Sequence, residues 1–295
     1  MSGVTTHPFR SIGGRVRRAI FSGVAESLGE RGTLIAGTVL ATLVASFCLL
    51  GPSFCLASPY TIHVGDAFYP PSLKFLLGTD QIGRDELARL IAGGYTTLAV
   101  SIPAAILAFV VGIVFGFSGG LGPIWLDKVL MRVLDAVLAF PALILLIFFA
   151  SLFTPSNSQL ILLLGLTSWP GLARLVRNEA IAQRGRDFVH ASRQCGAGTF
   201  YIARRHLLPV IAPVLVVNGT FLVGDQILAL SALSFLGLGI QPPDASWGGL
   251  LQAGLNLVVI DPWWMIVPPG VMIFLSVAAT NLIGQGILIR LEETP

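Results

Sequence analysis

A few polar side chains interrupt the long apolar stretches of this sequence and are the first candidates for chemistry. Asp225 is the one carboxylate that we place deep within an apolar stretch, and an ionisable group in such surroundings is costly enough to indicate function. Amides accompany it on the same stretch and on the last one, at Asn218, Gln226, Asn281 and Gln285. These groups predict either a translocation path, for which we choose Asn218, Asp225 and Gln226, or hydrogen bonds between helices.

The residue patterns of common active sites and nucleotide sites are absent. No G-x-x-x-x-G-K-[ST] phosphate loop occurs, and no lysine follows a glycine. Ser234 has no histidine on an apolar stretch to activate it, because all four histidines lie elsewhere (His7, His63, His190 and His206). A proton relay needs several carboxylates or histidines within the membrane, so a proton-coupled carrier is not favoured. We expect no catalytic residue, no metal site and no cofactor in this chain.

A polar segment at 177–206, between two apolar stretches, carries the second group of candidates. It reads R-D-F-V-H-A-S-R-Q-C-G at 186–196 and, after nine further residues, H-L-L-P at 206–209. The first part has the character of a short amphipathic helix, and its glycine allows a sharp turn of the backbone. Such a helix can bind in a groove of a partner protein. The residues assigned to this docking element are Phe188, Val189, His190, Ala191, Ser192, Gly196, Leu208 and Pro209.

The elements that position these groups are apolar helices. Hydrophobic residues make up 54% of the 295 residues and charged residues 11%, whereas about a quarter of the residues of a soluble domain are charged. A helix needs roughly 20 apolar residues to cross a bilayer. The predicted fold class is therefore all-α and polytopic, with six transmembrane helices at 33–50, 95–117, 133–153, 159–175, 207–236 and 263–289. The fifth is longer than one crossing requires, so we expect a break at Gly224 or a tilt.

The chain is divided accordingly into a tail at 1–32, a first helix at 33–50 and an external segment at 51–94. A core of five helices at 95–290 includes the loop at 177–206, and a short tail follows at 291–295. The first apolar run is long enough to span a membrane, so we interpret it as a retained helix rather than a signal peptide. Cys48 and Cys55 lie near its outer end, where pairing and two unpaired thiols both stay open.

The distribution of Lys and Arg predicts the orientation. With the N-terminus in the cytoplasm, fifteen basic residues lie inside and three lie outside, namely Lys74, Arg84 and Arg89. This bias predicts that both termini are cytoplasmic. The basic residues flank apolar spans and do not form an aromatic-interleaved patch, so nucleic acid is not an expected partner.

The segment at 186–209 resembles the cytoplasmic coupling motif of ABC importer permeases, E-A-A-x-x-x-G followed after nine residues by I-x-L-P. The glycine, the first alanine and the L-P pair are in register. His190 replaces the glutamate, Ser192 the second alanine and His206 the isoleucine. The missing glutamate implies one polar contact fewer with the ATPase, while the apolar face stays intact.

Three further stretches are similar to the dipeptide/oligopeptide/nickel permease family, second-subunit type. They are L-G-T-D-Q-I-G-R-D at 77–85, M-R-V-L-D at 131–135 with F-P at 140–141, and L-S-F-L-G-L-G at 233–239 with S-W-G at 246–248. Together they extend the resemblance from about residue 77 through the last span. Gln285 stands where many members have the aspartate of G-D-x-L-R-D, so no role of that acid is carried over.

The resemblance implies the type I ABC importer permease fold in a non-enzymatic subunit of the cell inner membrane. The implied partners are a homologous second permease, two ATPase subunits that bind ATP and magnesium, and an extracytoplasmic substrate-binding protein. The implied substrates are dipeptides or oligopeptides. Import of nickel or another metal complex by the same machinery stays open, because the coupling motif does not contact substrate.

Overall fold

The computed structural model describes residues 12–54, 57–152, 155–256 and 262–292. Within these ranges the chain forms helices and loops, and the sole β-type pairing is an isolated bridge between Thr79 and Asp85. The helices are α1 (Ile12–Phe54), η1 (Val64–Asp66), α2 (Glu86–Leu121), α3 (Ile124–Leu138), α4 (Ala142–Ser151), α5 (Asn157–Arg184), α6 (Asp187–Gln194), α7 (Thr199–Ile202), the π turn η2 (Ala203–Leu207), α8 (Leu208–Phe235), α9 (Trp247–Leu255) and α10 (Trp263–Glu292).

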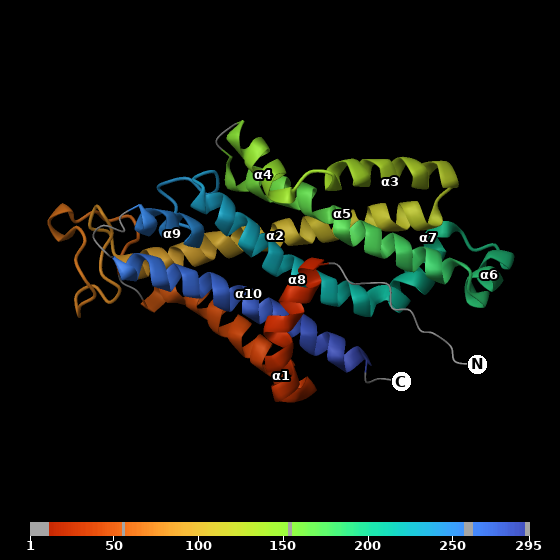
Figure 1. Cartoon of the computed structure of the whole chain (residues 1–295), viewed down its shortest axis with the longest axis horizontal. Helices are drawn as coiled ribbons and strands as arrows, with labels where there is room; N and C mark the ends of the chain where they lie inside the picture. The colour runs from red at the N-terminus through yellow and green to blue at the C-terminus, as the bar shows by residue number, and fades with distance from the viewer. Residues whose placement is uncertain (1–11, 55–56, 153–154, 257–261, 293–295) are drawn as a thin grey trace.

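The molecule is an elongated bundle in which α2, α5, α8 and α10 follow the long axis (Figure 1). The short helices α6 and α7 lie at one end, and the segment at 57–85 lies with α9 at the opposite end (Figure 1). Helices α2 and α5 approach closely because α2 has glycines on the contact face. A Cβ on Gly116 would lie 2.5 Å from the Val176 Cβ, so a larger residue there would separate the two helices.

The prediction of an all-α membrane protein is confirmed. Five helices in the described part of the chain are long and apolar enough to cross a membrane, within Arg31–Ser53, Glu86–Leu121, Asn157–Arg184, Thr199–Phe235 and Trp263–Leu291. Helices α3 and α4 together supply a sixth apolar segment, which is bent by 79°. The six segments therefore correspond in order to the six predicted spans.

The third span is not the continuous helix predicted at 133–153. Helix α3 ends at Leu138 and α4 begins after Pro141. Proline has no N–H to donate, and it disfavours helical backbone in the residue before it, which explains a break at this point. The fifth span has no break at Gly224, because α8 continues without interruption through that residue. The alternative expectation, a tilt of the long helix, stays a prediction.

Three helices extend into segments that we expected to be a tail or loops. Helix α1 begins at Ile12, within the tail predicted at 1–32. Helix α2 begins at Glu86 rather than at 95, and its N-terminus is capped by the Asp85 side chain, which accepts a hydrogen bond from the Ala88 N–H at 2.9 Å. Helix α5 continues to Arg184, so the first residues of the segment at 177–206 are helical. Helix α9 was not predicted, because nine residues are too few for a span.

Candidate functional site

Helices α6 and α7 form a hairpin at one end of the bundle, and we call residues 187–207 the coupling hairpin. Gly196 ends α6 in the left-handed conformation, with φ of +84°. Its N–H donates to the Arg193 carbonyl at 2.9 Å, and the Ala197 N–H donates to the Ser192 carbonyl at 3.0 Å. This pair of bonds is the Schellman arrangement that commonly ends a helix at glycine. Gly196 therefore forms the sharp backbone turn that the sequence analysis expects at this position.

The coupling hairpin is attached to the bundle by an apolar cluster. Val189 of α6 is completely buried, as is Leu207 of η2, and Ile202 of α7 is 1% exposed. They pack with Leu121 at the end of α2 and Ala180 of α5. The predicted docking residue Val189 thus faces its own chain, and its burial fixes the position of α6 on the bundle.

The other predicted docking residues lie at or near the hairpin surface. His190, Ala191, Gly196 and Pro209 are exposed, whereas Phe188, Ser192 and Leu208 are half-buried. Sequence reasoning missed Phe200 and Tyr201 of α7, which are 77% and 54% exposed. Two adjacent aromatic residues in an otherwise basic polar segment were the signal that could have identified them, because exposed aromatic side chains are typical of interfaces.

The three residues predicted to line a path do not form one cluster. Asn218 and Asp225 are seven residues apart on α8 and so share a face. Asp225 is exposed, and Asn218 donates from Nδ2 to the Val214 carbonyl at 2.8 Å. Gln226 is turned into the interior, is 0% exposed, and its amide has no hydrogen-bond partner among the described residues. The polar face of α8 therefore carries the exposed Asp225 and the half-buried Asn218.

The end of the bundle with the segment at 57–85, which the sequence analysis predicts to be the outer end, pairs its positive charges with carboxylates. Lys74 pairs with Asp66 at 2.7 Å, and Asp80 pairs with Arg84 at 2.6 Å and with Arg89 at 3.5 Å. These are the three basic residues that the orientation analysis assigns to the outside, so each has an acidic partner there. Four exposed arginines, Arg186, Arg193, Arg204 and Arg205, lie in or beside the coupling hairpin at the opposite end.

The motif at 77–85 builds a compact cap at this outer end. Gly78 and Gly83 both have positive φ, +69° and +79°, which favours glycine. The Trp264 Nε1–H at the start of α10 donates to the Thr79 carbonyl at 3.2 Å and so joins the cap to the bundle. Trp247 of α9 is fully buried, and its Nε1–H donates to the Leu90 carbonyl of α2 at 3.1 Å. The two family-type motifs at this end therefore have structural contacts with α2 and α10.

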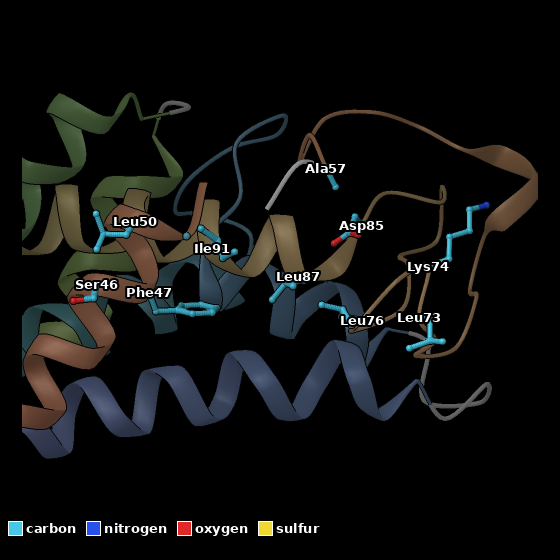
Figure 2. A pocket seen from close by; sticks show the side chains of 11 residues that line it. Ser46, Phe47, Leu50, Ala57, Leu73, Lys74, Leu76, Asp85, Leu87 and Ile91 are labelled. Atoms are coloured by element: carbon cyan, nitrogen blue, oxygen red, sulfur yellow. The ribbon is translucent and has the colours of Figure 1, made fainter. Parts of the chain in front are cut away.

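A cavity of about 850 Å³ lies between the outer ends of α1 and α2 and the segment at 57–85. Figure 2 shows Phe47, Leu50 and Ile91 along one side, with Lys74 at the outer margin. Its two charged residues already have other contacts, because Lys74 pairs with Asp66 and Asp85 caps α2. The cavity is thus an apolar recess without a built polar ligand site.

Comparison with known proteins identifies the family. The model of the family described as "binding-protein-dependent transport system inner membrane component" matches residues 112–292. A putative peptide transport system permease protein of Brucella suis biovar 1 is 37% identical over 266 residues, which cover 89% of this chain and 88% of the relative.

Two further relatives agree. A putative peptide transport system permease protein of Brucella abortus biovar 1 is 38% identical over 254 residues, covering 85% of this chain and 84% of its own. The dipeptide transport system permease protein DppC of Bacillus subtilis is 33% identical over 253 residues, which cover 86% of this chain and 79% of the relative. The helical bundle, the coupling hairpin and these similarities together show that the chain belongs to the family of binding-protein-dependent transport system inner membrane components, the permease subunits of ABC importers.

Proposed function

We propose that this chain is one of two homologous permease subunits of an importer that carries dipeptides or oligopeptides across the cell inner membrane. The observation that carries the proposal is the coupling hairpin, which lies at one end of the bundle and continues directly into α8 (Figure 1). The names of the relatives support peptides as substrate, because all three are described as peptide or dipeptide permeases. The substrate itself is delivered by a separate extracytoplasmic binding protein.

The coupling hairpin has the features of a docking element for an ATPase subunit. Its exposed surface combines the apolar side chains of Ala191, Phe200 and Tyr201 with His190. A short helix with such a surface fits a groove on a partner protein. ATP and magnesium are then bound by two ATPase partner chains, since the sequence contains no phosphate loop. Closure of the ATPase dimer would rotate the two permease bundles against each other and alternate the access of the path.

The exposed face of α8 supports a second permease beside this one. Leu228 is 43% exposed and shares that face with Asp225, three residues before it. A carboxylate at this depth is costly in contact with lipid. A second subunit across a water-filled path would remove Asp225 from lipid, and this is the basis for assigning Asn218 and Asp225 to the path. The charge distribution supports a cytoplasmic location for the hairpin and for both termini.

Purification of this chain from its native membrane in mild detergent tests the proposal. We expect a second six-helix permease, ATPase chains and a peptide-type binding protein to be recovered with it, and ATP hydrolysis by the preparation. The ligand that the binding protein carries distinguishes the substrates, since a nickel or other metal complex in place of a peptide would replace the peptide assignment. Recovery of the chain without an ATPase would overturn the coupling role and favour a self-contained carrier.

A further inference from the structure

The coupling hairpin has two arms, α6 on one side and α7 with η2 on the other. A hydrogen bond between side chains joins the two arms. Ser192 Oγ, near the end of α6, lies 3.0 Å from Nε2 of His206 in the π turn that leads into α8. Ser192 Oγ also donates to the Phe188 carbonyl oxygen at 2.8 Å. A serine hydroxyl has one proton to donate, so the proton in the other bond comes from the histidine. Both bonds form together when His206 carries its proton on Nε2 and donates it to Ser192 Oγ.

Aromatic rings of both arms hold the His206 ring in place. The Phe188 ring of α6 lies 6.1 Å from it between centroids, at an interplanar angle of 48°. The Tyr201 ring of α7 lies 5.7 Å away in an edge-to-face arrangement at 70°. Such tilted pairs are favourable ring geometries. His206 thus contacts α6 by a hydrogen bond and a ring, and it contacts α7 by a second ring.

The backbone turn that connects the two arms contains residues with few conformational restraints. The turn at 195–198 reads C-G-A-G, and glycine leaves the backbone many conformations. Gly196 and Gly198 both face open space, because no atom lies within 4 Å of the point where a Cβ would stand on either residue. The orientation of α6 relative to the start of α8 therefore also depends on contacts across the hairpin, namely the apolar cluster around Val189 and the Ser192–His206 bond.

Ser192 and His206 are also two of the three positions at which this chain departs from the coupling motif. The motif has alanine where Ser192 stands and isoleucine where His206 stands. The structure brings these two departures into direct contact. Both positions are polar in this chain, and the bond between them is specific to the two residues that it carries there.

We propose that Ser192 and His206 form a strut that makes α6 and the start of α8 move as one body. A displacement of α6 by an ATPase would then pass to α8, which carries the exposed Asp225, instead of being absorbed by the C-G-A-G turn. His206 is a positioning residue in this account, because it acts on α8 and not on the solute. The inference rests on the proposed docking of the hairpin to an ATPase.

The test compares Ser192→Ala, His206→Ile and the double variant in the assembled importer. The readout is the amount of solute transported per ATP hydrolysed. We expect each single change to lower this ratio by about 3- to 10-fold, the range set by one net hydrogen bond, while hydrolysis continues. We expect the double variant to be no more impaired than the more impaired single variant, because all three changes remove the same bond. Such non-additivity is an outcome that two independent structural defects would not produce.

Matched controls lie away from the hairpin. Ser276→Ala removes a serine bond to its own helix of the same kind, from Oγ to the Met272 carbonyl at 2.7 Å, and His63→Ile replaces an exposed histidine of the outer end. Neither should change the transport ratio.

Hydrogen exchange of residues 187–194 in the full-length chain tests the strut without an ATPase. We expect faster exchange in both single variants and no further increase in the double variant, because the same bond is lost in each. Unchanged exchange in the single variants, or a double variant as impaired as the two singles combined, overturns the strut even if the importer assembles. If the variants show this exchange pattern but the wild-type chain binds no ATPase, the proposed function is overturned and the strut remains a property of the hairpin alone.

Discussion

Asp225 shows which part of the candidate path could be identified from the sequence alone. The sequence identifies it because a carboxylate stands out in an apolar stretch, and helical periodicity relates it to Asn218. The same periodicity puts Gln226 about 100° away, and the structure buries that amide completely. Neighbours on a helix face different surroundings, so Gln226 does not share the face of Asp225.

Replacement of Asp225 tests the path assignment. Asp225→Asn should lower the transport rate by roughly tenfold, corresponding to about 1.4 kcal/mol of lost interaction along the path, while assembly with the partner chains is kept. The measurement is solute uptake by the reconstituted importer. Asp244→Asn, at the outer end where Asp244 accepts a hydrogen bond from Tyr60 at 3.2 Å, is the control. Equal uptake by the Asp225 and Asp244 variants would remove Asp225 from the path.

Gly196 leads to a different prediction, because glycine is favoured here by the backbone conformation and not by a lack of space for a side chain. Its φ of +84° disfavours residues with a Cβ, yet nothing lies near the Cβ position. Gly196→Ala should destabilise the turn by about 1–2 kcal/mol, and Gly196→Asn should be tolerated better because asparagine visits this conformation. The measurement is ATP-driven uptake, with the order glycine, asparagine, alanine. Asparagine and alanine variants of identical activity would contradict a conformational role.

At the scale of the elements, the broken third span shows that the hydropathy of a sequence does not reveal where a span bends. Hydropathy detects enough apolar length for a crossing but does not reveal a bend of 79°. The F-P pair at 140–141 was visible in the sequence, and proline is a common cause of such breaks. Helix α3 also begins earlier than the predicted span, because its first turns mix polar and apolar residues and so fall below an apolar threshold.

Two ion pairs connect α3 to α5, and their geometry predicts that they contribute unequally to the stability of the chain. Arg177 binds Asp127 through two nitrogens, one at 2.6 Å, and both side chains are less than a quarter exposed. Arg174 binds Asp135 at 2.7 Å through one nitrogen, and both are about half exposed. Bidentate and sheltered pairs are stronger than exposed ones.

Arg177→Lys should therefore lower the stability of the chain by about 1 kcal/mol more than Arg174→Lys, because lysine cannot reproduce the two parallel bonds. Thermal unfolding of the purified chain in detergent provides the comparison. A larger shift for the Arg174 variant would show that the α3–α5 contact is held in another way.

At the scale of the whole molecule, the bundle has two chemically different ends. The outer end pairs its basic residues with Asp66 and Asp80, and its motifs are tied to α10 and α2 by Trp264 and Trp247. The opposite end carries the coupling hairpin, with exposed aromatic residues and nearby arginines. This polarity agrees with a subunit that receives solute at one end and contacts an ATPase at the other.

The number and order of apolar segments could be predicted from the sequence, because span length and hydropathy are local properties. The contacts between segments could not. The Ser192–His206 bond joins positions fourteen residues apart, and the Trp247–Leu90 bond joins positions 157 apart. Such pairings depend on how the helices pack, which one sequence does not specify.

Site-specific cross-linking from the coupling hairpin tests the central claim most directly. A photoreactive benzoylphenylalanine would replace Ala191 on the exposed surface of α6 and, in a control, Tyr60 at the outer end, which is 52% exposed. Illumination of the assembled complex should link position 191 to an ATPase chain and position 60 to none. A link to the ATPase from position 60, or its absence from position 191, would contradict the account.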